Sequence, residues 1–345
     1  MRGWIQWANG VTGDLRYLPD GATSDVGRPE HQNGASPLEW PPERTHDEAS
    51  VSIGRAPGAG AIPSRSWQRM LPHVELGKSI QARHLQVGIE RATTFDLHAR
   101  AGKVLTRMDG SRYDYAPVTS RGTVIGYISR KRLADVPPDT DIRDLTHSLA
   151  GGAIVSADTP IAQLMEWISS RRILFVLDGR DITGFVTIWD FNKQPSRAYL
   201  YLILAGLEIA LADLVRWRYG KDQGRVVGFL GGNDADAVLE RVRSDQDADA
   251  DADLVSYLNF KHLLRIFEKD RALRAELGKY SQEKWKSFTW PLGELRNEVM
   301  HPVSSFVTSA KDMADLAEHA HGATQLVDQA VEALRKHHGE PHPKV

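Results

Sequence analysis

The sequence predicts an α+β protein in three parts: a disordered N-terminal arm, a region of two βαββα repeats, and an all-α helical bundle. Three observations predict this order. Residues 1–66 are interrupted throughout by glycine and proline, residues 67–195 alternate strand-like with helix-like runs, and residues 196–345 carry apolar side chains at helical spacing. The 345 residues leave room for about two folded domains and an additional segment.

Composition excludes several classes of function before any motif is considered. With 43 Lys and Arg against 45 Asp and Glu, the net charge is −2, so bulk positive charge cannot hold nucleic acid, although a local basic patch can. The absence of cysteine excludes disulfides, cysteine-ligated zinc and a thiol nucleophile. No run of residues has the spacing of a convincing metal site, so we expect no metal.

The N-terminal arm and the most apolar segment decide the expected location. Residues 1–66 keep no apolar period, so they cannot bury enough surface to offset their ordering entropy, and they open without the apolar run of a signal peptide. Residues 199–215 are short for a membrane span and contain Glu208 and Asp213, which predicts a buried core helix. We therefore expect a cytoplasmic protein with no membrane partner.

The repeated order of elements is clearest in residues 152–194. The predicted elements there are a strand at 153–155, a helix capped by Thr159 and started by Pro160, strands at 173–177 and 182–187 around a tight turn, and a short helix near Trp189. Residues 74–135 repeat this order less clearly, with strands at 115–119 and 123–129 before a helix at 131–135. Two such units of about 60 residues predict an internal repeat.

The end of the second unit carries a recognisable motif. Residues 184–190, GFVTIWD, match a Gly–apolar–apolar–Thr/Ser–x–x–Asp pattern, and the whole region resembles a tandem pair of CBS domains. The resemblance implies that Asp190, with Thr187 nearby, holds the ribose hydroxyls of an adenine nucleotide such as AMP, ADP or ATP, acting as a regulator. In the first unit Arg132 occupies the Asp position. The alternative is a dimerisation scaffold that binds no ligand.

Apolar periodicity and capping residues predict five helices after residue 195. These are residues 196–219 capped by Ser196 and ended by Gly220, a short helix from Asn233 or Asp234 to about Arg243, residues 253–267, a helix from Trp290 or Pro291 to Met300, and residues 309–337 with a Ser309–Asp312 capping pattern. Several helices joined by loops predict an up-down bundle.

The most informative string is residues 292–303, LGELRNEVMHPV. His301 precedes a proline, which predicts that the helix ends there, with Arg296 roughly 7–8 Å earlier along the axis. We expect both side chains to face one cleft. An imidazole moves protons near neutral pH and a guanidinium matches phosphate oxygens, so this pair suits cleavage of RNA by its own 2′-hydroxyl without a metal ion.

This string resembles the signature of the HEPN superfamily, an Arg, a polar residue and a His separated from the Arg by four to six residues. Arg296, Asn297 and His301 fill these positions. The resemblance implies a helical domain that dimerises, two motifs meeting in one composite site, and metal-independent endoribonuclease activity of a toxin or defence type. It also implies Glu208 as a supporting acid in the first long helix. Val303 stands where members silenced by a nucleotidyltransferase have Tyr, so such silencing is not expected.

Alternative interpretations of these residues remain open at this point. Arg296 could pair with Glu294 or Glu298 while His301 simply ends a helix, and the protein would then be a non-catalytic nucleotide-sensing or dimerisation module. Arg91 and His98 show a similar spacing, which we interpret as a coincidence. A basic-aromatic stretch precedes the motif and could either bind single-stranded RNA or belong to the core. Its members are Lys279, Tyr280, Lys284, Trp285, Lys286 and Trp290.

Overall fold

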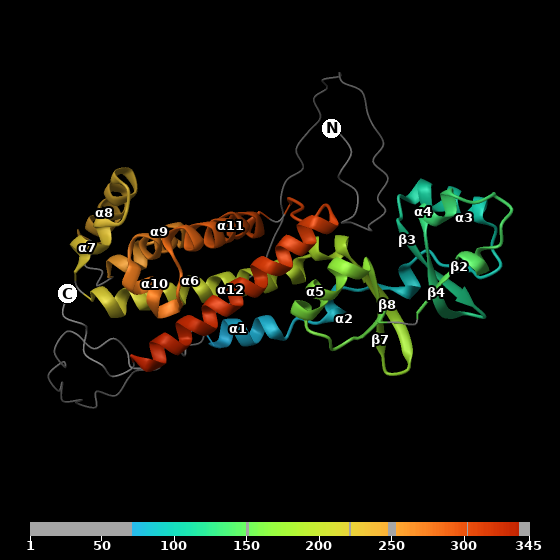
Figure 1. Cartoon of the computed structure of the whole chain (residues 1–345), viewed down its shortest axis with the longest axis horizontal. Coiled ribbons are helices and arrows are strands. Elements are labelled where there is room, and N and C mark those ends of the chain that lie inside the picture. The colour runs from blue at the N-terminus through green and yellow to red at the C-terminus, as the bar shows by residue number, and fades with distance from the viewer. Residues whose placement is uncertain (1–70, 150–151, 221, 248–252, 302, 338–345) are drawn as a thin grey trace, which may run out of the picture. The chain divides into compact units, whose positions relative to one another are not determined.

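The computed structural model describes residues 71–149, 152–220, 222–247, 253–301 and 303–337. The arm expected at residues 1–66 lies outside these described residues. An α/β region with two four-stranded sheets is followed by a helical region (Figure 1). Residue contacts place the described residues in one compact unit. The α+β class and the order of an α/β region followed by helices are therefore confirmed.

The second repeat has the expected order of elements. They are β6 (Ile154–Ser156), α5 (Ile161–Arg171), β7 (Ile173–Asp178), β8 (Asp181–Thr187) and the 3-10 helix η4 (Ile188–Asn192). Strand β6 runs parallel to β7 through the α5 crossover, and β7 and β8 form an antiparallel hairpin. The expected cap of α5 is wrong, because Pro160 rather than Thr159 occupies the N-cap position and no side chain caps the helix.

The first repeat repeats this arrangement. Its elements are β2 (Phe95–Asp96), α3 (Ala101–Ser111), β3 (Tyr115–Ser120), β4 (Thr123–Ser129) and α4 (Arg130–Ala134). Each sheet is completed by a short strand that precedes the other repeat in the chain. Strand β1 (Val87–Gly88) pairs with β8, and β5 (His147–Ser148) pairs with β4. The two repeats are therefore interlocked through their edge strands.

This pairing of edge strands explains why glycine occupies position 184 on β8 and the equivalent position 126 on β4. A Cβ on Gly184 would lie 2.6 Å from the carbonyl oxygen of Val87, and a Cβ on Gly126 would collide with the carbonyl oxygen of His147. Both contacts involve backbone atoms of the neighbouring strand, which cannot move aside without disrupting the strand pairing. Only glycine therefore fits at these two positions.

We expect Gly184→Ala to destabilise the protein by about 1–3 kcal/mol, because the added methyl group must displace the paired strand β1. Urea unfolding measures this. Gly110→Ala is the matched control, since no atom lies within 4 Å of its Cβ position on helix α3. That variant should be neutral or stabilised by up to about 1 kcal/mol. Equal stability of the two variants would contradict this explanation of the glycine.

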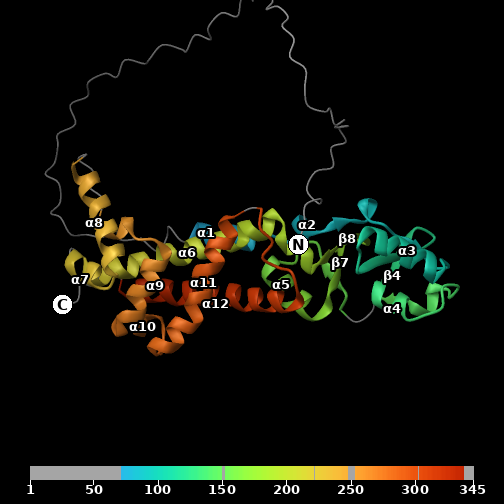
Figure 2. The same ribbon diagram turned by 90° about the horizontal axis from the view of Figure 1, so that it is seen from above.

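The helical region surrounds one long central helix. Helix α6 (Gln194–Tyr219) packs along α12 (Ala310–Lys336), as both views show (Figures 1 and 2), and also contacts α9, α11 and α1. The bounds of the remaining helices are α1 Leu71–Lys78, α2 Ala82–Leu85, η2 Ile89–Arg91, η3 Ile142–Leu145, α7 Gln223–Gly228, α8 Gly232–Asp247, η5 Leu254–Tyr257, α9 Phe260–Lys269, α10 Arg271–Leu277 and α11 Gln282–Met300.

Within the described ranges, α6 is the one helix long and apolar enough to cross a membrane by length and composition. However, 67% of its most apolar window is buried inside the protein. Its apolar side chains join a core that also contains Val155, Leu174 and Phe191 of the second repeat. The prediction of a buried core helix is confirmed, and the second repeat and the helical region share that core.

Several predicted helix limits need correction. Helix α6 begins at Gln194, because Pro195 suits its first turn, and Ser196 does not cap it. Helix α11 begins at Gln282, capped by Ser281, so Pro291 lies inside the helix rather than at its start. The single helix expected at residues 253–267 is two elements, η5 capped by Asp253 and α9 capped by Asn259, because each side chain accepts a backbone N–H of its own turn.

The predicted cap of the last helix is confirmed. The Ser309 hydroxyl accepts the Asp312 N–H at 3.1 Å. The Asp312 carboxylate accepts both the N–H and the hydroxyl of Thr308, and these hydrogen bonds lower the pKa of Asp312 to about 2. Helix α12 therefore starts at a fixed point, directly after the loop that follows the Arg–His motif.

Candidate functional site

The motif residues lie at the C-terminal end of α11. The helix ends at Met300, and His301 has an extended backbone while its N–H still donates to the carbonyl oxygen of Glu298 at 3.1 Å. The His301 carbonyl oxygen accepts the N–H of Ser304 at 3.2 Å and its hydroxyl at 3.0 Å. The imidazole itself is exposed. The predicted helix end at the motif is therefore confirmed.

Arg296 is half-buried and makes no hydrogen bond or ion pair with any residue that the structure describes. Glu294 pairs instead with Lys261, at 3.0 Å. The alternative in which Arg296 pairs with Glu294 or Glu298 is therefore wrong. The half-buried side chain of Asn297 and the imidazole of His301 likewise lack hydrogen bonds within the described ranges.

Other arginines of the helical region that are not exposed have hydrogen-bond or ion-pair partners. The buried guanidinium of Arg274 donates to the carbonyl oxygens of Phe267 and Glu268 at the end of α9. Arg216 and Arg218 form ion pairs with Asp253 and Asp270. A guanidinium that is removed from water normally has such partners, because its desolvation is costly. The lack of partners at Arg296 is therefore exceptional in this region.

Glu208 of α6 lies close enough to Arg296 of α11 for their charges to interact. Burial raises the pKa of the Glu208 carboxyl above its ordinary value, and the Arg296 charge and the backbone N–H of Phe260 oppose that rise. The two positions are 88 residues apart in the sequence, and packing of α11 against α6 brings them together. An acid beside the Arg is what the supporting role of Glu208 requires.

The expected single cleft for Arg296 and His301 stays a prediction. Helix α11 ends at Met300, and His301 has an extended backbone, so the helical repeat does not fix the direction of its side chain relative to Arg296. The charge of Arg296 interacts with Glu208 of α6, while His301 is exposed. No hydrogen bond joins Arg296 to His301 among the described residues.

The aromatic residues before the motif divide into core and surface. Trp285 is fully buried, donates its Nε1–H to the carbonyl oxygen of Leu264 at 3.0 Å and stacks on Phe267. The core interpretation is thus correct for Trp285. Trp290 is 65% exposed and lines a shallow hollow on α11 with Lys286.

The candidate nucleotide residues form the first turn of η4. Thr187 donates its backbone N–H and its hydroxyl to Oδ2 of Asp190, at 2.6 and 2.9 Å. The other carboxylate oxygen, Oδ1, pairs with the ammonium of Lys193 at 2.7 Å. Asp190 is 5% exposed. The structure brings Thr187 and Asp190 together as expected, but as a capping box whose carboxylate is fully engaged.

The corresponding turn of the first repeat has the opposite charge. Ser129 caps α4 by accepting the N–H of Arg132, and the exposed guanidinium of Arg132 donates to the carbonyl oxygen of Asp144 at 3.3 Å. No carboxylate occupies the position that Asp190 holds in the second repeat. The chemistry expected of Asp190 is thus confined to one repeat.

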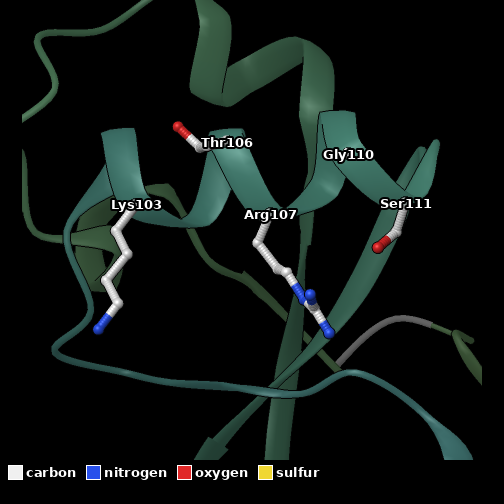
Figure 3. A pocket seen from close by; sticks show the side chains of 5 residues that line it. All are labelled: Lys103, Thr106, Arg107, Gly110 and Ser111. Atoms are coloured by element: carbon white, nitrogen blue, oxygen red, sulfur yellow. The ribbon is translucent and has the colours of Figure 1, made fainter.

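Among the residues that the structure describes, no group of three or more His, Asp or Glu side chains could hold a metal ion. An open hollow lies along α3 in the first repeat, where Lys103 and Arg107 extend to the same side of the helix (Figure 3). Neither cation belongs to the Arg–His motif or to the Thr187–Asp190 turn.

Sequence reasoning missed the residues that hold the segment after His301. Asn192, at the end of η4, and Arg197, in the first turns of α6, hydrogen-bond to backbone groups of residues 298–307. Their partners lie more than 100 residues away in the chain, so no local pattern indicated them. The one available signal was an arginine on an otherwise apolar helix face, which predicts a specific buried partner.

No protein-family model matches this chain, and no curated protein sequence matches it. Several solved structures are similar to part of it. A hemolysin-like protein containing CBS domain of Oenococcus oeni PSU is 18% identical with a TM-score of 0.29, over 35% of this chain and 93% of that one. The CBS domain of the bacterial CNNM/CorC family Mg²⁺ transporter in complex with ATP is 17% identical with a TM-score of 0.32, over 39% and 96%. CbpB in complex with c-di-AMP is 16% identical with a TM-score of 0.33, over 38% and 94%.

Proposed function

We propose that this protein is a cytoplasmic, metal-independent endoribonuclease of HEPN type, with a toxin-like or defence-like role. Arg296, Asn297 and His301 form its catalytic set, and Glu208 is the supporting acid. The observation that carries the proposal is that the side chains of Arg296, Asn297 and His301 make no hydrogen bond among the described residues, while Arg296 interacts with the charge of Glu208. A half-buried arginine near an acid, on a helix that ends at an exposed histidine, is costly to maintain for stability alone and useful for binding a phosphate.

The proposed reaction uses the nucleophile that RNA already carries. The 2′-oxygen attacks the adjacent phosphorus while an imidazole takes the 2′-hydroxyl proton. The bond from phosphorus to the 5′-oxygen breaks, and an imidazolium gives that oxygen a proton. The products are a 2′,3′-cyclic phosphate and a 5′-hydroxyl. The Arg296 guanidinium stabilises the charge of the pentacovalent phosphate, and Asn297 donates a hydrogen bond to the substrate.

We further propose that the active form is a homodimer in which two motifs complete one site. No hydrogen bond joins Arg296 to His301 among the described residues of one chain, so a second copy that places its His301 near the first copy's Arg296 would supply that juxtaposition. Light scattering at micromolar concentration is expected to give twice the mass of one chain. A monomer at that concentration would contradict the composite site.

The second repeat is proposed to bind an adenine nucleotide through its ribose. The two ribose hydroxyls would donate to the Asp190 carboxylate, which requires them to replace the Lys193 ammonium at Oδ1. Thr187 keeps the carboxylate in place through its two hydrogen bonds to Oδ2. Nucleotide binding at this turn would therefore release Lys193, which lies between η4 and α6.

Incubation of the purified full-length protein with end-labelled RNA in excess EDTA tests the proposed function. Cleavage that continues in EDTA supports the nuclease. If the protein binds an adenine nucleotide but leaves RNA intact under all conditions, the non-catalytic nucleotide-sensing module is the correct alternative.

A further inference from the structure

We propose that Asn192 and Arg197 are positioning residues that hold the chain before and after His301, at residues 298–299 and 304–307, and thereby fix the place of His301. The role of these residues in catalysis rests on the proposed nuclease function. Their hydrogen bonds to the chain around His301 can be tested without any RNA. We call this set of contacts the junction clamp, formed by Asn192, Arg197 and their backbone partners in residues 298–307.

Asn192 uses both ends of its side-chain amide. Its Nδ2 donates to the carbonyl oxygen of Val307 at 2.7 Å, and its Oδ1 accepts the N–H of Phe306 at 2.9 Å and of Val307 at 3.0 Å. A side-chain amide thus pairs with the chain in the way a neighbouring strand would. These three hydrogen bonds hold the loop that links His301 to α12.

Arg197 holds the other end of the same segment. Its guanidinium donates to the carbonyl oxygens of Glu298 at 2.9 Å and Val299 at 3.3 Å, and also to that of Ser304. The last carbonyl groups of a helix lack partners within the helix, and a buried cation is well suited to satisfy them. The guanidinium also lies 4.7 Å from the ring centre of Phe306. Arg197 is 4% exposed, so these contacts are shielded from water.

The clamp encloses His301 from both sides. Arg197 contacts residues three and two positions before it and Ser304 three positions after it, and Asn192 contacts the chain five and six positions after it. The imidazole itself has no hydrogen bond among the described residues, so its location depends on its backbone. The clamp provides the rigid support that a catalytic histidine needs.

The clamp also joins the proposed nucleotide turn to the proposed catalytic segment. Asn192 is the last residue of η4, two positions after Asp190, and Lys193 bridges the Asp190 carboxylate and the carbonyl oxygen of Leu85 at 2.7 Å each. Any movement of η4 must move Asn192 and hence Phe306 and Val307. Loss of the Lys193 contact is the change that ribose binding would produce.

Amide hydrogen exchange of the full-length protein tests the clamp directly. In Asn192→Ala, the amides of Phe306 and Val307 lose their acceptor and should exchange at least about 10-fold faster than in the wild type. Asn233→Ala, an exposed asparagine on α8, is the matched control and should leave both rates unchanged. Wild-type exchange at Phe306 and Val307 in the Asn192→Ala variant would overturn the proposal.

Kinetics then distinguish positioning from general stability. We expect Asn192→Ala to lower kcat by about 10-fold with KM nearly unchanged, because RNA still binds while His301 is misplaced. Because Arg197→Ala could fail to fold, Arg197→Lys is the companion variant. It keeps the charge but loses the forked donors, so its kcat should fall between those of wild type and Asn192→Ala. If exchange rises but kcat is unchanged in both variants, the segment is held for stability and the positioning role is wrong.

Absence of RNA cleavage by the wild type would refute the proposed function, and the exchange result would still decide whether the clamp exists. Faster exchange in Asn192→Ala with an inactive wild type would mean that the clamp serves another activity of this helical region, which overturns its catalytic meaning. The two failures are therefore distinguishable.

Discussion

Replacement of either Arg296 or His301 by alanine is expected to lower the rate of RNA cleavage by at least about 10²-fold, measured with end-labelled RNA in EDTA. The reason differs for the two residues. His301 is the exposed imidazole available for proton transfer, and Arg296 is the half-buried guanidinium whose charge interacts with Glu208. Neither side chain makes a hydrogen bond in the described part of the chain, so both variants should remain folded, as circular dichroism would verify.

The first repeat offers a matched control for this experiment. Arg91 and His98 have a similar Arg-to-His spacing, but they lie far from α11 in the sequence. The Arg91 side chain pairs with Glu90, and the His98 ring contacts Arg143. Arg91→Ala and His98→Ala should therefore cleave RNA at the wild-type rate. Undiminished cleavage by both Arg296→Ala and His301→Ala would remove the assignment. An equal loss in the control pair would point to a nonspecific effect of removing charge.

Glu208→Gln adds a finer test of the same site. It keeps the shape of the side chain but removes the negative charge near Arg296. We expect a smaller loss of activity than in Arg296→Ala, because the guanidinium remains but loses the charge that orients it. A loss as large as that of Arg296→Ala would indicate that the carboxyl takes part in the chemistry directly.

Replacement of Asp190 by asparagine is expected to weaken adenine-nucleotide binding by about 10- to 100-fold, because hydrogen bonds to a charged acceptor are stronger than those to a neutral one. Isothermal calorimetry with ATP, ADP and AMP measures this. The substitution keeps the size of a side chain that caps η4, so the turn should persist. Unliganded RNA cleavage should be unchanged.

Lys193 gives the opposite expectation. Its ammonium occupies Oδ1 of Asp190 in the structure, so Lys193→Met removes a competitor of the ribose and should strengthen nucleotide binding. Arg132→Ala, at the corresponding position of the first repeat, should not change it. Weaker binding in Lys193→Met would mean that Lys193 contacts the nucleotide itself. If the wild type binds no adenine nucleotide, the proposed regulation is wrong, and the proposed nuclease activity is unaffected.

If both sites bind their ligands, the nucleotide and RNA must change each other's affinity by the same factor, typically about 5–150-fold. The junction clamp is the physical route for this coupling, because it connects η4 to the segment that carries His301. The coupling factor should therefore fall towards one in Asn192→Ala, while nucleotide affinity alone is retained.

Much of the fold could be predicted because local chemistry determines it. The end of α6 before Gly220, the end of α11 at His301 and the Ser309 cap of α12 each depend on one or two neighbouring residues. The βαββ order followed from alternating apolar runs and a tight turn. The start of α11 was missed because Pro291 resembled a helix start, while Ser281 supplied the actual cap nine residues upstream of Trp290.

The candidate site was less predictable because it depends on packing between distant segments. The motif indicated Arg296 and His301, and the resemblance implied Glu208, whose charge interaction with Arg296 arises from packing of α11 against α6. The hydrogen bonds that hold the chain around His301 come from Asn192 and Arg197, more than 100 residues earlier. Such contacts follow from the tertiary fold and leave no local pattern in the sequence.

One measurement tests the central claim most directly. An RNA oligonucleotide is compared with an otherwise identical one that carries a 2′-deoxy nucleotide at the mapped cleavage position, both in EDTA, with the product ends analysed by mass spectrometry. The account predicts that the RNA yields a 2′,3′-cyclic phosphate and a 5′-hydroxyl, and that the 2′-deoxy substrate is not cut at that position. Cleavage of the 2′-deoxy substrate, or products with a 5′-phosphate, would contradict the account.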